Sequence, residues 1–121
     1  MADLRVSEMQ TMQHKLKEKY KGTWNPLIPE HGRNSLLWMM EEVGEVISVI
    51  KKRGDEAIMT DPGVRRAFLE ELVDVTMYFY DLLICYGISP EEFSEAFLHK
   101  HLTNMERDFV SEHRKYRDGD R

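Results

Sequence analysis

The sequence predicts an all-α protein, a single domain that resembles a four-helix bundle. Apolar residues recur three and four positions apart along most of the chain, and residues typical of helix caps bound these segments. No stretch shows the two-residue alternation of a half-buried strand. Residues 1–110 are expected to form the domain, and the charged, glycine-containing residues 111–121 a flexible tail.

The first helix is expected to run from Ser7 to about Tyr20. Ser7 followed by Gln10 has the form of a capping box, apolar residues then recur at helical spacing, and Gly22 ends the pattern. Residues 23–33 contain two prolines and a glycine, which is typical of a loop. The first helix is therefore separated from the rest of the chain by a long connection.

The second helix is expected to be capped by Asn34 or Ser35 and to end near Gly54. Three basic residues in its last turn complement the helix dipole, and a glycine is a usual stop. Its apolar residues fall within roughly 80° of one another around the axis and predict a core-facing stripe. The stripe is formed by Leu36, Met40, Val43, Ile47 and Ile50.

The opposite face of this helix carries three carboxylates within about one turn: Glu41, Glu42 and Glu45. Trp38 lies one turn before them and Val49 one turn after them, so apolar residues bracket the charges. Like charges in such a band are costly unless a cation neutralises them, because an unpaired buried carboxylate shifts its pKa or is not tolerated. The stretch therefore predicts a binding site for a divalent cation.

Two further helices follow. Asp61 and Pro62 form a favoured helix start, and the helix that they open is apolar almost all round until Gly87 ends it. Ser89 then starts a fourth helix with a capping box, and this helix is expected to reach about Phe109. The single cysteine of the chain lies in the third helix without a partner thiol, which favours a buried structural thiol.

The third helix repeats the acidic feature of the second. Glu71 and Asp74 lie three residues apart, about 60° from one another on the helix surface. Two helices that carry carboxylates can face each other across a bundle, as in bundle metal sites. Since no cysteine or histidine enters either cluster, oxygen ligation suits Mg²⁺, with Mn²⁺ as an alternative, rather than zinc.

The acidic residues also carry a resemblance. Glu42-x-x-Glu45, followed after 25 residues by Glu71-x-x-Asp74, resembles the signature of the MazG-like nucleoside triphosphate pyrophosphohydrolases, in the all-α NTP pyrophosphatase superfamily. The strings EEVGE and EELVDV are similar to that family as well, and the likeness covers roughly residues 36–107. The resemblance implies that these four residues bind Mg²⁺, that Glu42 takes part in catalysis, and that Glu41 is a ligand or the base that orients water.

Basic and aromatic residues are the candidates for substrate binding. The resemblance suggests three residues of the fourth helix: Lys100, Asn104 and Arg107. Lys52 lies about two turns beyond the acidic cluster, while Trp24 and Asn25 could stack on and hydrogen-bond a base. Each has a structural alternative: a solvent-facing strip for the fourth-helix residues, a dipole-complementing helix end for Lys52, and a loop anchor for Trp24.

Composition limits the class of protein. The net charge of −5 and the pI near 5.5 argue against a general nucleic-acid binder, which would show a basic face. Apolar runs are too short for a membrane span, and no signal-peptide pattern opens the chain, so a cytoplasmic protein is expected. Both acidic helices are more apolar than one chain of this size can cover, which predicts a homodimer or homotetramer.

The activity that the resemblance implies is metal-dependent hydrolysis of a (d)NTP to a (d)NMP and pyrophosphate, in the house-cleaning of nucleotide pools. Two enzymatic alternatives are a relative that acts on phosphoribosyl-ATP and one that is specific for dUTP or dCTP. An alternative of another class is a helical module that binds a metal or nucleotide without turnover.

Overall fold

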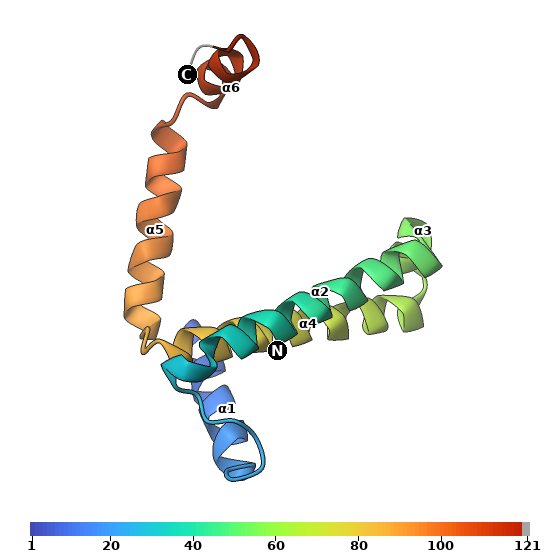
Figure 1. Ribbon diagram of the computed structural model, residues 1–121. Coiled ribbons are helices and arrows are strands. Elements are labelled where there is room, and N and C mark those ends of the chain that lie inside the picture. The colour runs from blue at the N-terminus through green and yellow to red at the C-terminus, as the bar shows by residue number, and fades with distance from the viewer. Residues whose placement is uncertain (120–121) are drawn as a thin grey trace. The chain divides into compact units, whose positions relative to one another are not determined.

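The computed structural model describes residues 1–119, which form six α-helices and one short 3-10 helix (Figure 1). The only β-type pairing among these residues is an isolated bridge between Lys21 and Trp24. The all-α prediction is therefore confirmed. Contacts divide the chain into two compact units, Met1–Pro90 and Glu91–Arg121.

Helix α1 (Val6–Lys19) begins one residue before the predicted start. The backbone N–H of Arg5 donates to Glu8 Oε1 at 2.8 Å, so Glu8 satisfies a free donor at this end of the helix. The predicted capping box of Ser7 and Gln10 is wrong. Gln10 is buried, and its amide donates to the backbone carbonyl of Ile88 at 3.3 Å, which ties α1 to the chain beyond the third predicted helix.

Helix α2 (Gly32–Arg53) follows the 3-10 helix η1 (Pro29–His31), and it starts before the expected cap residues. Ser35 lies inside the helix, where its hydroxyl is buried 3.9 Å from the sulfur of Cys85. The prediction that Asn34 or Ser35 caps this helix is therefore wrong, because η1 leads the chain directly into the first turn.

A short helix, α3 (Asp55–Thr60), connects α2 to α4 (Pro62–Cys85) and was not expected from the sequence. Gly54 ends α2, as predicted, with a positive φ of 83° that glycine adopts without strain. Asp61 caps α4 as predicted: Oδ1 accepts from the backbone N–H groups of Gly63 at 2.9 Å and Val64 at 3.2 Å.

Helices α2 and α4 lie side by side and run in opposite directions (Figure 1). Buried and half-buried residues recur along each helix at alternating spacings of four and three residues, as in a coiled coil. On α2 they include Ser35, Met39, Glu42, Val46 and Val49. On α4 they include Val64, Phe68, Glu71, Val75, Tyr78, Leu82 and Cys85. This seam between the helices thus contains one glutamate from each of them.

In the single chain the predicted core-facing stripe of α2 is half-buried at Val43 and exposed at its other four positions. Its members Leu36, Met40, Ile47 and Ile50 are 43%, 56%, 50% and 41% exposed. The prediction of a core-facing stripe is wrong because α2 packs against α4 through the seam. Each seam residue of α2 precedes a stripe residue by one position, and Glu42 is one of these seam residues. Leu72 of α4, 39% exposed, lies on the same side of the helix pair by helical geometry. We call these five residues the apolar flank.

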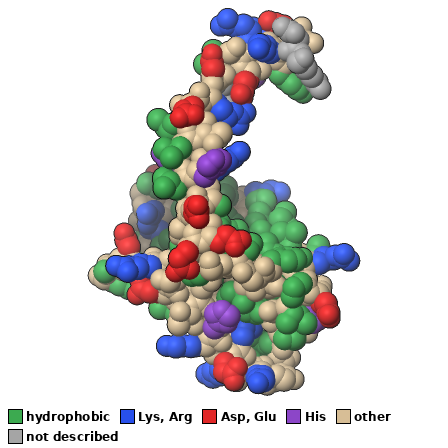
Figure 2. Space-filling model, turned by 90° about the vertical axis from the view of Figure 1, so that its left-hand side faces the viewer, with side chains coloured by type: hydrophobic (Ala, Val, Ile, Leu, Met, Phe, Trp, Pro, Cys, Tyr) green, Lys and Arg blue, Asp and Glu red, His purple; other side chains and the backbone are tan. Residues whose placement is uncertain are grey.

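Hydrophobic side chains also reach the surface elsewhere on the part formed by α1 to α4 (Figure 2). The buried apolar residues among those described are few: Ile58, Val64, Tyr80, Leu83 and Cys85. No single helix of the described residues has the length and hydropathy needed to cross a membrane.

The second unit contains helix α5 (Pro90–Glu106) and helix α6 (Phe109–Arg117). Asp108 caps α6, because its Oδ1 accepts from the backbone N–H of Ser111 at 2.9 Å. The expected flexible tail is thus helical as far as Arg117, and the last two residues of that tail, 120–121, lie outside the described residues.

Candidate metal centre

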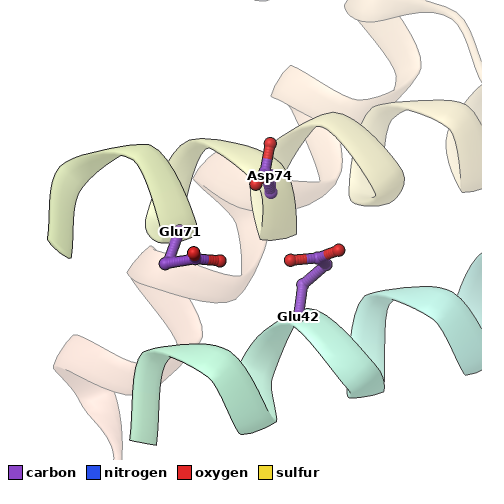
Figure 3. A group of neighbouring side chains, drawn as sticks. All are labelled: Glu42, Glu71 and Asp74. Atoms are coloured by element: carbon purple, nitrogen blue, oxygen red, sulfur yellow. The ribbon is translucent and has the colours of Figure 1, made fainter. Parts of the chain in front are cut away.

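Three carboxylates converge between α2 and α4. One oxygen from each of Glu42, Glu71 and Asp74 lies within 4.8 Å of the other two. Glu42 projects from α2 toward Glu71 on the facing side of α4, and Asp74 lies one turn further along α4 (Figure 3). The two glutamates are half-buried in the seam and Asp74 is exposed. Helix packing therefore brings carboxylates of α2 and α4 together, as the sequence predicted, but without Glu45.

The electrostatics of this acidic cluster favour a cation. The pKa of Glu42 is raised above its ordinary value, first by desolvation and then by the negative charges of Asp74, Glu71 and Glu45. Each of these effects disfavours the ionised form, and a bound cation would reverse the charge effects. Three carboxylate oxygens with no sulfur or imidazole suit Mg²⁺ or Mn²⁺. The donor set thus fits the predicted metal.

Two of the predicted acidic residues lie beside the cluster. Glu45 is exposed and outside the group of converging oxygens, although its charge contributes to the raised pKa of Glu42. Glu41 is exposed and lines a pocket that adjoins the cluster. The structure therefore brings together three of the four residues of the acidic signature.

A pocket of about 670 Å³ opens next to the cluster, within the range of volumes typical of small-molecule sites. It is open to solvent on one side, and its walls come from α1, the loop after α1, α2 and α4. Its lining residues are Gln13, Leu16, Lys17, Thr23, Trp24, Asn25, Trp38, Glu41, Glu42, Asp74, Met77, Tyr78 and Asp81. The candidate metal ligands Glu42 and Asp74 therefore belong to the wall of a cavity large enough for a nucleotide.

A second polar group lines this pocket, and the sequence interpretation missed it. Asp81 is buried; its Oδ1 accepts from Gln13 Nε2 at 2.9 Å and its Oδ2 lies 3.5 Å from Lys17 Nζ. Desolvation raises the pKa of Asp81, and the contacts with Gln13 and Lys17 partly oppose this effect. The available signal was a single carboxylate inside the apolar run YFYDLLIC.

Tyr78 also lines the pocket. Its ring lies 6.0 Å from that of Trp38 between centroids, at an interplanar angle of 52°. Desolvation and then the charge of Glu42 are the leading causes of a raised pKa of the phenol. Tyr78 therefore stays protonated and remains a hydrogen-bond donor beside the carboxylates.

The predicted base-binding residues Trp24 and Asn25 both line the pocket. The ring of Trp24 stacks on Tyr20 with centroids 4.2 Å apart, and Lys17 Nζ lies 4.9 Å from the Trp24 ring centroid. Trp24 thus anchors its loop on α1 as well as forming part of the wall. Lys52 is exposed in the last turn of α2 and is not among the lining residues.

The other predicted substrate-binding residues, Lys100, Asn104 and Arg107, belong to the second unit. Arg107 Nε donates to Glu112 at 3.2 Å, and this pairing raises the pKa of the guanidinium. Asn104 Oδ1 is buried without a hydrogen-bond partner among the described residues.

The first unit therefore holds a candidate metal centre, an adjoining pocket and a partly buried ion pair in the wall of that pocket. Comparison of the chain with protein-family models, with curated proteins and with solved structures gave no match.

Proposed function

We propose that the protein hydrolyses nucleoside triphosphates to nucleoside monophosphates and pyrophosphate, with Mg²⁺ held by Glu42, Glu71 and Asp74. The observation that carries the proposal is the convergence of these carboxylates, from two helices, beside a pocket of about 670 Å³. The resemblance of the acidic signature to the MazG-like family supports it. House-cleaning of the (d)NTP pool in the cytoplasm is the role that this resemblance implies.

The charge of the pocket makes a cation necessary for such a substrate. A triphosphate is polyanionic, and four of the lining residues are carboxylates: Glu41, Glu42, Asp74 and Asp81. When bound, Mg²⁺ supplies the positive charge that offsets the phosphate oxygens and the leaving pyrophosphate. The acidic cluster is thus expected to bind the substrate only together with its metal.

Residues of the chain itself supply the proton transfer and the orientation. Glu41 is an exposed carboxylate in the pocket wall, so it can accept a proton from the attacking water. The water oxygen then bonds to the α-phosphorus while the bond to the bridging oxygen breaks and pyrophosphate leaves. The protonated phenol of Tyr78 can donate a hydrogen bond within the same pocket.

The remaining substrate contacts stay predictions. Trp24 and Asn25 line the pocket and are the candidates for the nucleobase. For Lys52, exposed at the end of α2, the dipole-complementing role is the better supported one, because three basic residues occupy that last turn. We further propose that the protein acts as a homodimer or homotetramer, since the apolar flank is exposed in the single chain.

A pyrophosphate-release assay with a panel of NTPs and dNTPs tests the proposal. Glu71→Gln removes one converging carboxylate with little change in shape, and Mg²⁺-dependent release should fall at least about a hundredfold. Glu70→Gln is the matched control, because Glu70 is exposed on the same helix and outside the converging group. Equal loss in both variants, or retained turnover in Glu71→Gln, would contradict the assignment.

The release assay, combined with a metal titration, distinguishes an enzyme from a non-catalytic binding module. Titration of the wild type with Mn²⁺ reports metal binding independently of turnover. Metal binding that depends on Glu71, together with no release from any nucleotide of the panel, would favour a helical binding module over an enzyme.

A further inference from the structure

The pocket has a second polar end, away from the acidic cluster. Asp74 and Asp81 both line the pocket and project from one strip of α4. They lie seven residues apart, which is about 10 Å along a helix axis. Gln13 and Lys17 of α1 meet Asp81 at this second end. A ligand that fills the pocket therefore has one end near the candidate metal centre and the other near α1.

Lys17 is the cation of this pocket. Among the lining residues of the described chain it is the only lysine or arginine, whereas four are carboxylates. Its side chain is 18% exposed, and its ammonium contacts Asp81 Oδ2 at 3.5 Å and the Trp24 ring at 4.9 Å from the centroid. An ammonium has three donor hydrogens, so these contacts leave it able to donate to a ligand.

Asp81 is placed to hold Lys17 rather than to bind a ligand itself. Its side chain is only 5% exposed, and each carboxylate oxygen has a partner: Gln13 Nε2 for Oδ1 and Lys17 Nζ for Oδ2. Gln13 Nε2 also lies 3.5 Å from the backbone carbonyl of Met77, which fixes the amide in turn. A lysine held in this way loses less side-chain freedom when a ligand binds than a mobile surface lysine.

We propose that Lys17 is a specificity-determining residue of the pocket, which donates to an acceptor oxygen at the end of the ligand distant from the acidic cluster. Asp81 is its positioning residue. The inference rests on the proposed function for the class of ligand, a nucleoside triphosphate. The acceptor is a carbonyl oxygen of the base or an oxygen of the phosphate chain, since an ammonium binds both through the same chemistry.

Calorimetric titration with two probes in the presence of Mg²⁺ distinguishes these sources. The probes are the non-hydrolysable α,β-methylene analogue of UTP, and inorganic triphosphate, which lacks the nucleoside. Lys17→Met removes the ammonium and keeps the stem, and we expect about a tenfold loss of affinity or more. Loss for the UTP analogue alone assigns the contact to the base, and loss for both probes assigns it to phosphate.

Two other variants complete the test. Asp81→Asn keeps the shape but removes the charge that holds Lys17, and it should weaken the same probe by a smaller factor. Lys15→Met is the matched control, because Lys15 is exposed on α1 and does not line the pocket; its affinities should equal those of the wild type.

The outcomes separate this inference from the proposed function. If Lys17→Met and Asp81→Asn bind both probes as the wild type does, and only their melting temperatures fall, the ion pair is structural and the inference is overturned. A wild type that binds neither probe would overturn the proposed function and the inference together.

Discussion

At the scale of single residues, the ionisation of Glu42 links the acidic cluster to the stability of the metal-free protein. Desolvation, followed by the charges of Asp74 and Glu71, raises its pKa above the ordinary 4.5. The folded state therefore holds this proton more tightly than the unfolded state does. Its stabilising contribution is complete below the unfolded pKa and is lost as the pH rises through the folded pKa.

We therefore predict that Glu42→Gln stabilises the metal-free protein at neutral pH. The neutral amide avoids both the desolvation of a charge and the repulsion within the cluster. Urea unfolding in the presence of a chelator should show a higher free energy of unfolding for the variant at neutral pH, and no such gain well below pH 4.5. A variant less stable than the wild type at neutral pH would show that the three carboxylates do not repel one another in solution.

The acidic residues were the most predictable part of the site, because their spacing on two helices is visible in the chain. Glu42, Glu71 and Asp74 converge as expected, whereas Glu45 does not join them. Lys17 and Asp81 could not be paired from the sequence, since they lie in separate helices and nothing local relates them. Contacts between distant residues depend on how the helices pack, and periodicity does not determine that.

At the scale of helices, boundaries with a side-chain mechanism were predicted well. Asp61 caps α4 and Gly54 ends α2 as expected. The start of α2 was not predicted correctly, because its first turn continues from η1 without a side-chain cap. The packing face of α2 was also predicted incorrectly. Two series of mainly apolar residues, offset from each other by one position, run along the helix. The series that contains Glu42 faces α4.

The cap of α4 gives a prediction at this scale. Asp61→Ala removes the acceptor of two backbone N–H groups, and the free energy of unfolding should fall by about 1 kcal/mol. Chemical denaturation measures this loss. Asp61→Ser retains a capping oxygen and should keep most of the stability; an equal loss in both variants would contradict the capping role.

At the scale of the whole molecule, the exposed apolar flank is the surface that the proposed assembly would bury. Its five residues, from Leu36 to Leu72, lie on one side of an antiparallel helix pair, and few apolar residues are buried in the described chain. Two such pairs can close a four-helix bundle around a two-fold axis, which would bury both flanks.

We predict that the wild type sediments as a homodimer or homotetramer and that Ile47→Glu shifts it toward the monomer. A charge in the centre of the flank would have to be buried without a partner on assembly. Met12→Glu is the matched control, since Met12 is equally exposed, at 50%, but lies on α1. Sedimentation velocity decides, and a monomeric wild type would contradict this account of the flank.

The identity of the products tests the central claim most directly. Phosphorus NMR of a reaction mixture with Mg²⁺ and a nucleoside triphosphate substrate separates nucleoside monophosphate and pyrophosphate from nucleoside diphosphate and phosphate. The proposed function predicts monophosphate and pyrophosphate, formed by the wild type and not by Glu71→Gln. Formation of diphosphate and phosphate, or no product from any NTP or dNTP, would contradict it.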